Sequence, residues 1–179
     1  MFTKISGTIG SGLIMLSLAA SGAIAPAAAG GGVGRLPPDL QDVRAAVAKY
    51  HDVDSARADG YSDAYEPCVS SPSGTMGVHF VNQSLASDNE IDPLKPEILL
   101  YLPKSNGGFK FMGVEYFKAD ADQNPATTED RPWLFGTPFG GPMPGHAPGM
   151  PIHYDLHAWV GVGNPAGALE AFNPAVSCP

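Results

Sequence analysis

Three apolar segments of the sequence carry side chains that can bind a metal ion. His79 stands in "GVHFV" and Glu115 in "GVEYF", each among apolar neighbours, and His153 and His157 stand in "MPIHYDLHAW". Burying an isolated imidazole or carboxylate is costly unless the group is paired or bound to a metal. We therefore predict that these four residues share one site, with Glu115 as a ligand or a general base. Such nitrogen and oxygen donors suit one divalent transition metal ion, Zn²⁺, Fe²⁺, Mn²⁺ or Cu²⁺, with a coordination position left open.

The spacing of His153 and His157 limits how both can reach one ion. Residues four apart in an extended strand lie about 13 Å from each other, whereas residues two apart lie about 6.6 Å from each other. A regular strand therefore favours a pair made of Asp155 and one of the two histidines. A bulge, a strand that begins only after His153 because of Pro151, or a helix would bring the histidines closer. Asp155 is alternatively the hydrogen-bond acceptor that orients a histidine ring.

Other interpretations of the same residues use them differently. Each histidine, taken singly, can be a hydrogen-bonded residue on the wet face of a sheet. His146, in "MPGHAPGMP", is a loop residue that can close over the pocket or act as an alternative ligand. If Met143 and Met150 face the histidines, the site is suited to copper, because thioethers favour Cu(I).

The elements that must position these side chains begin with a helix. Apolar residues in "DLQDVRAAVAKYHD", residues 39–52, recur with the period of an amphipathic helix. A second short helix is predicted to follow and to stop at Gly60, because glycine commonly ends a helix. A further short helix is indicated by "AGALEAF", residues 166–172.

Between these helical segments the pattern is typical of β-strands, which are predicted at residues 75–82, 97–103, 109–118 and 152–162. The Asn-Gly pair in "KSNGG" predicts a hairpin between the second and third strands. The sequence thus predicts an α+β domain, with one or two N-terminal helices packed on an antiparallel sheet of about four strands. Residues 119–149 are rich in glycine and proline, and we predict that they form a long ordered loop that covers the site.

Alternation along the strands predicts which side chains share a face. The last strand places His153, Asp155, His157 and Trp159 on one face and its apolar residues on the other. The third strand places Gly113, Glu115 and Phe117 on one face, opposite Met112, Val114 and Tyr116.

The N-terminal residues 1–29 have the layout of a secretory signal peptide, with Lys4, an apolar run and small residues that predict cleavage after Ala29. Residues 30–38 are then a flexible leader and residues 39–179 a single domain. We expect a secreted or periplasmic protein without a membrane anchor after cleavage. Its only cysteines, Cys68 and Cys178, are predicted to form a disulfide that adds roughly 4 kcal/mol by closing a long loop.

Eighteen acidic residues against ten basic ones exclude a basic surface for nucleic acid, so the expected partner is a metal ion or a small molecule. We predict a secreted metal-binding protein that acts as a mononuclear metal-dependent enzyme. The alternative is a non-catalytic module that binds copper or a small ligand, and a third possibility is a disulfide-closed binding domain without metal. The motifs of cupins, zincins and serine hydrolases are absent, so the sequence indicates no family.

Overall fold

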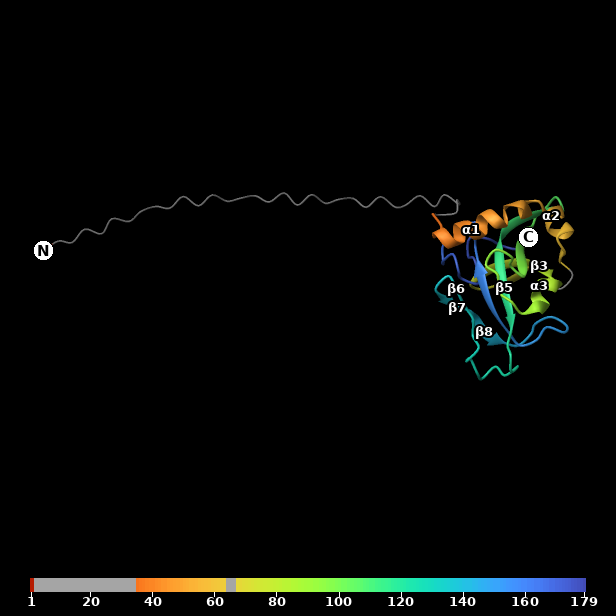
Figure 1. Ribbon diagram of the computed structural model, residues 1–179. Helices are drawn as coiled ribbons and strands as arrows, with labels where there is room; N and C mark the ends of the chain where they lie inside the picture. Colours follow the sequence, from red (N-terminus) through yellow and green to blue (C-terminus); the bar gives the residue numbers. More distant parts are fainter. Residues whose placement is uncertain (2–34, 64–66) are drawn as a thin grey trace. The chain divides into compact units, whose positions relative to one another are not determined.

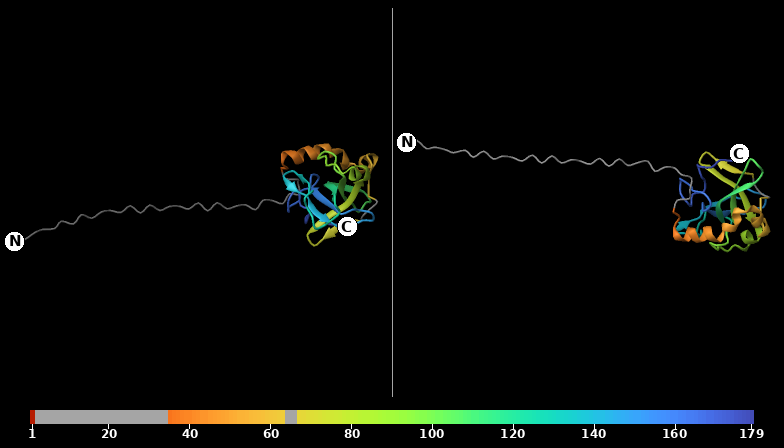
Figure 2. Two further views of the ribbon diagram at one scale, coloured as in Figure 1. Left: turned by 60° about the horizontal axis from the view of Figure 1, so that its bottom comes forward. Right: turned by 90° about the horizontal axis from the view of Figure 1, so that it is seen from above.

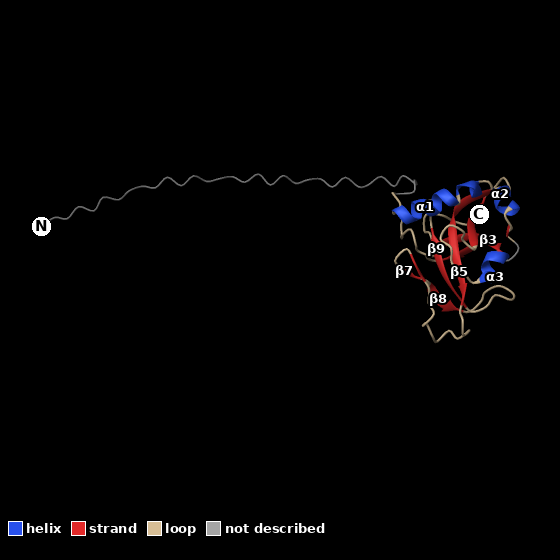
Figure 3. Ribbon diagram, in the orientation of Figure 1, coloured by secondary structure: helices blue, strands red, loops and turns tan. Residues whose placement is uncertain are grey.

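An antiparallel sheet dominates the fold (Figures 1 and 3). It has seven strands. The computed structural model describes residue 1 and residues 35–63 and 67–179, and it contains three α-helices in those ranges. The strand order is β1-β3-β4-β5-β9-β8, with β2 also paired to β3, and β6 and β7 form a separate small sheet. The strands are β1 Tyr61–Ser62, β2 Val69–Ser71, β3 Gly74–Asn82, β4 Ile98–Pro103, β5 Phe109–Ala119, β6 Trp133–Leu134, β7 Thr137–Pro138, β8 Gly140–Met143 and β9 His153–Ala158.

The predicted mixture of helix and antiparallel sheet is confirmed, but the prediction of about four strands is too low. The four predicted strands correspond to β3, β4, β5 and β9, and the Asn-Gly turn joins β4 to β5 as expected. The additional strands β1, β2 and β8 are each four residues or shorter. Such short edge strands carry too few residues to set up a recognisable alternation.

The N-terminal helical segment is interrupted. Helix α1 spans Pro38–Ala46, a 3₁₀ helix spans Ala48–His51, and α2 spans Val53–Ala58. The side chain of Asp52 accepts a hydrogen bond from the backbone N–H of Asp54, so Asp52 starts α2, in agreement with the second short helix predicted here. Gly60, with φ of +92°, follows the end of α2, where the second helix was predicted to stop.

The structure differs from the predicted helices at two further places. Helix α3, Gln83–Asp88, was not predicted; Asn82 caps it by accepting hydrogen bonds from the backbone N–H groups of Ser84 and Leu85. The helix predicted at residues 166–172 is wrong, because that segment forms a series of turns. In this segment Asn164 accepts a hydrogen bond from the N–H of Ala166, which favours a turn over a helix.

The two faces of the sheet contribute to two separate clusters of buried side chains. The larger cluster combines strand residues such as Phe80, Tyr101 and Tyr116 with Leu40 and Val43 of α1. The smaller cluster lies on the other face and contains six buried residues: Ile98, Leu100, Met112, Phe117, Trp159 and Val162. The face assignment predicted for β9 is confirmed, since Tyr154, Leu156 and Ala158 are in the larger cluster and Trp159 is in the smaller.

A β-bulge corrects the face assignment predicted for β5. Leu100 pairs with Gly113 but Tyr101 pairs with Phe111, so Met112 is an extra residue in β5. Met112 therefore belongs to the same cluster as Phe117, and strict alternation had placed these two residues on opposite faces. The alternation resumes after the bulge and keeps Glu115 on the face of the smaller cluster.

Residues 119–149, predicted as a loop, include the short strands β6, β7 and β8. Strand β8 pairs with β9 through Gly140 and Asp155 and through Met143 and His153, with an irregularity between these pairs. Proline and glycine within β8 hide this strand from a sequence pattern. The segment is thus partly built into the sheet, and only its remaining residues are loop.

The predicted disulfide between Cys68 and Cys178 is confirmed and links positions 110 residues apart. Such a bond is compatible with an extracytoplasmic location. Residues 2–29 of the predicted signal peptide and residues 30–34 of the predicted leader lie outside the described residues. Among the helices of the described ranges, none is long and apolar enough to span a membrane.

Candidate metal centre

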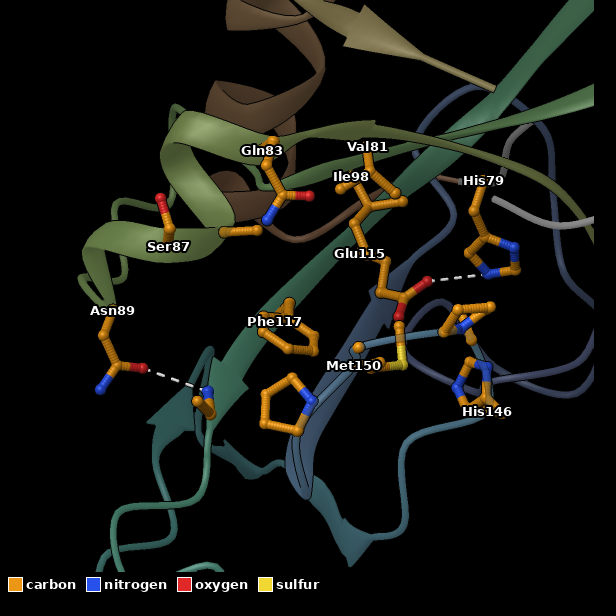
Figure 4. Close-up of a pocket in the computed structure, with 16 residues that line it drawn as sticks. His79, Val81, Gln83, Ser87, Asn89, Ile98, Glu115, Phe117, His146 and Met150 are labelled. Atoms are coloured by element: carbon orange, nitrogen blue, oxygen red, sulfur yellow. Dashed lines mark hydrogen bonds and ion pairs between the residues drawn. The ribbon is translucent and has the colours of Figure 1, made fainter. Parts of the chain in front are cut away.

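His79, Glu115 and His157 form a buried group on the face of the smaller cluster. One ligand atom of each residue lies within 4.8 Å of the others, a spacing at which all three can contact one metal ion. The carboxylate atom Oε2 of Glu115 lies 3.0 Å from Nε2 of His79 and 3.3 Å from Nε2 of His157. All three side chains are at most 7% exposed. Figure 4 shows Glu115 directed toward His79.

Strand register brings these three residues together from three strands. Glu115 of β5 is directly opposite His157 of β9, because the two strands pair without irregularity from Val114 to Ala119. His79 of β3 reaches the same face across β4, where it pairs with Leu100. Strands β5 and β9 are paired and lie side by side (Figure 3), and Figure 2 shows the domain from two further sides.

A glycine near the group permits the close approach of β5 and β9. A Cβ atom at Gly113 would lie 2.5 Å from the carbonyl oxygen of Ala158, which is too close for any side chain. Gly113 precedes Glu115 by two residues and Ala158 follows His157. The small size of this residue therefore helps to hold Glu115 and His157 opposite each other.

His153 and Asp155 lie on the same face as His157 but outside this group of three. Strand β9 is regular from His153 onward, so the two histidines are separated by the full extended spacing and only His157 faces Glu115. The ring of His153 stacks on Phe117, with centroids 5.0 Å apart, and its Nδ1 lies 3.1 Å from the carbonyl oxygen of Pro151. Asp155 is half-buried and pairs in register with Phe117.

Burial acts to raise the pKa of both carboxyl groups near the histidines, but only at Glu115 do neighbouring charges outweigh it. Burial would raise the pKa of Glu115, but the imidazoles of His157 and His79 outweigh it and hold that pKa below its ordinary value. The pKa of Asp155 is raised by burial and by the nearby Glu115. Glu115 is therefore the carboxylate of this region that keeps its charge, which a metal ligand requires.

The lack of hydrogen-bond partners for the His157 ring is consistent with a role as a metal ligand. Its side chain is 1% exposed, and neither ring nitrogen has a hydrogen-bond partner among the described residues, apart from the ion-pair contact of Nε2 with Glu115. Buried polar atoms in native proteins almost always have partners, so unpaired ones need an explanation. A bound metal ion would supply one for Nε2 and for Glu115 Oε2, because it would coordinate both atoms.

A pocket of about 450 Å³ adjoins the group (Figure 4). Strands β3, β4 and β5 form its floor, while α3 and residues 146–151 form its walls. His79 and Glu115 line one end of it. The lining includes His146 and Met150 but, among the described residues, not Met143. His146 is exposed, and its ring lies 5.3 Å from that of His153, measured between centroids.

Sequence patterns indicated only part of this pocket's lining: His146 was predicted to lie over the site, and it does line the pocket. Val81, Ile98 and Phe117 were visible only as strand residues, and the contribution of α3 depended on a helix that was not predicted. One usable signal was Asn82, because asparagine before "QSLASD" is a favourable start for a helix.

Comparison with known proteins identifies no relatives on which an assignment could rest. No protein-family model matches the chain, and no curated protein and no solved structure matches it significantly. The function is therefore inferred from the geometry of His79, Glu115, His157 and the adjoining pocket.

Proposed function

We propose that the protein is an extracytoplasmic metalloprotein that binds one divalent transition metal ion through His79, Glu115 and His157. The observation that carries this proposal is the convergence of three buried ligand atoms within 4.8 Å, from three different strands. Two imidazoles and one carboxylate suit Zn²⁺, Fe²⁺, Mn²⁺ or Cu²⁺. The disulfide between Cys68 and Cys178 supports the extracytoplasmic location.

The adjoining pocket favours an enzyme over a storage site. Catalytic metal sites commonly have three protein ligands and leave a further position open, whereas structural sites are closed by four. His79 and Glu115 line the pocket, so a small molecule in it can approach the metal position. A bound ion at such a position supplies Lewis acidity. The chain itself orients the ligands and, through Ile98 and Phe117, keeps water away from one side of the site.

A non-catalytic copper module is the second candidate. Met150 and His146 line the same pocket as His79 and Glu115. A thioether and additional imidazole would complete a coordination sphere suited to copper and close the open position. This candidate predicts selectivity for copper over zinc and no coordination site for an added ligand.

Metal analysis of the full chain, purified without a histidine tag, tests the proposal. We expect about one equivalent of metal per chain, and a large loss of it in His79→Ala and Glu115→Gln. His51→Ala is a matched control, because His51 is exposed and lies outside the group. Protein that is free of metal and stays so after exposure to Zn²⁺, Fe²⁺, Mn²⁺ and copper would contradict the proposal, as would full metal content in both variants.

Replacing the metal with Co²⁺ separates the enzyme from the closed copper module. The visible spectrum of Co²⁺ responds to a change in its coordination sphere. An open position predicts a spectral change when azide is added, and a closed site with Met150 predicts none. If Met150→Leu abolishes copper binding but leaves zinc binding unchanged, the copper module is the better description.

A further inference from the structure

We infer that the pocket binds the apolar part of a small monocarboxylate, whose carboxylate group reaches the metal position at His79 and Glu115. This inference rests on the proposed function, because the metal provides the partner for the carboxylate. It adds the chemical class of the ligand, which the metal-binding residues alone do not define.

The pocket separates polar from apolar surface along its length. His79 and Glu115 lie at one end (Figure 4). Most other lining side chains are apolar and come from the sheet, α3 and the loop at residues 146–151, among them Val81, Ala86, Ile98, Phe117 and Met150. A ligand that fits this arrangement has one polar group and an apolar body.

Charge favours an anion of low charge at the metal end. A divalent ion held by one carboxylate and two neutral imidazoles keeps one net positive charge, which complements one carboxylate. None of the described residues that line the pocket is lysine or arginine. A phosphate or a dicarboxylate carries more charge and normally requires such side chains, so the lining disfavours both.

The size of the pocket limits the apolar part. A volume of about 450 Å³ lies in the range of pockets that enclose small organic molecules. A polar rim lies away from His79 (Figure 4). It is formed by the exposed side chains of Gln83 and Ser87 in α3 and of Asn89 just after this helix. An unbranched acid of medium length can thus extend from the metal position over Phe117 and Ile98 toward this rim. Octanoate is a suitable probe, and acetate shares its head group but lacks the chain.

Calorimetric titration of zinc-loaded protein with acetate, butyrate, hexanoate and octanoate tests the inference. We expect the affinity to rise along the series, with octanoate binding about 100-fold more tightly than acetate, because each buried methylene contributes favourably. Octanoate should also bind at least tenfold more weakly to protein stripped of zinc. This series needs only the wild-type chain.

Two variants of α3 locate the binding site. Ala86→Phe places a large side chain in the pocket, and Ser84→Phe places the same side chain on the same helix at an exposed residue outside the lining. We expect Ala86→Phe to lose the preference for octanoate while keeping its zinc content and its affinity for acetate. Ser84→Phe should behave like the wild type.

The outcomes separate this inference from the proposed function. Metal content is measured in every sample, and the acid series is run with whichever of Zn²⁺, Fe²⁺, Mn²⁺ and copper is bound, so failure to load any of the four contradicts the proposed function. The inference is wrong, and the metal site stands, if zinc binds but the affinity for octanoate is no higher than that for acetate. The same holds if octanoate binds equally well to protein without zinc. Unchanged octanoate preference in folded Ala86→Phe would likewise overturn it.

Discussion

The face of the sheet that carries Phe80, Tyr101 and Tyr116 is filled by apolar side chains, whereas the face that carries Glu115 and Phe117 adjoins a pocket of about 450 Å³. Polar atoms on the two faces also differ. On the filled face, the Tyr101 hydroxyl donates to the carbonyl oxygen of Tyr50 and the Tyr116 hydroxyl to that of Pro93, both at 2.7 Å. On the pocket face, neither buried ring nitrogen of His157 has a hydrogen-bond partner among the described residues, and Nε2 has only its 3.3 Å ion-pair contact with Glu115.

This difference distinguishes side chains whose polar atoms are paired within the fold from side chains that could hold a metal ion. A buried hydroxyl with a backbone partner has its hydrogen-bonding requirement met within the chain. For His157 the chain supplies only the 3.3 Å contact of Nε2 with Glu115 Oε2, and a bound metal ion would give Nε2 a further partner. The same sheet can therefore use one face for stability and the other for binding, and each face can be tested by its own substitutions.

The largest expected effect compares two buried phenylalanines. Phe80 is fully buried and packs against Tyr101, with ring centroids 4.6 Å apart, whereas Phe117 lines the pocket. We expect Phe80→Ala to lower the free energy of unfolding by about 4 kcal/mol, because it leaves an enclosed cavity. Phe117→Ala should cost about 2 kcal/mol, because the removed volume joins a pocket that already exists.

Urea denaturation of both variants in the presence of a chelator measures this comparison without a contribution from bound metal. Ile98→Ala provides a second substitution on the pocket face. Equal losses in Phe80→Ala and Phe117→Ala would show that the pocket face is packed as tightly as the other face, and the distinction between them would not hold.

The difference between the faces could be predicted in part from the sequence. Alternation in the last strand correctly separated His157 and Trp159 from Tyr154 and Leu156, since a regular strand repeats every two residues. The same spacing argument indicated that His153 and His157 would not readily contact one ion, and the regular strand β9 keeps them apart.

The remaining features depended on contacts between distant segments. The bulge at Met112 arises where β5 pairs with β4, and alternation within β5 alone does not reveal it. The pairing of Glu115 with His157 is fixed by strand order, which a single sequence does not specify. Helix α3 has only six residues, too few for a clear helical period, yet it forms one wall of the pocket.

A second prediction compares the buried carboxyl groups of Glu115 and Glu97. Glu97 is 1% exposed and accepts a hydrogen bond from the backbone N–H of Phe117, but it lies outside the group with the two histidines. Burial therefore raises the pKa of Glu97 to about 8. Between pH 4.5 and 8 the unfolded chain releases this proton while the folded chain retains it, so the free energy of unfolding falls as the pH rises.

Glu97→Gln removes this titration while keeping an acceptor for the N–H of Phe117. We expect the wild type to lose about 3 kcal/mol relative to Glu97→Gln between pH 5 and pH 8.5, at about 1.4 kcal/mol per pKa unit. Denaturation curves at both pH values measure the difference, and Glu90→Gln, at an exposed position, is the control. A constant difference between wild type and Glu97→Gln across this range would show that Glu97 is ionised in the folded protein.

The smallest expected effect distinguishes two histidines of the same strand. His157 faces Glu115, whereas His153 stacks on Phe117 four residues away. We expect His157→Ala to weaken zinc binding about 100-fold, because it removes one of three ligands. His153→Ala should change the affinity less than about threefold, although it also removes a buried side chain. Competition with a coloured chelator measures both affinities.

Because both histidines are buried, each variant loses packing as well as an imidazole, and only the metal affinity separates a ligand from a neighbour. If both substitutions weaken zinc binding equally while the variants stay folded, His153 belongs to the site and β9 must bend on metal binding to bring the two rings together. If only His157→Ala has the effect, the regular strand decides which histidine is used. The choice then follows from the register of β9 with β5, since only one of the two positions is opposite Glu115.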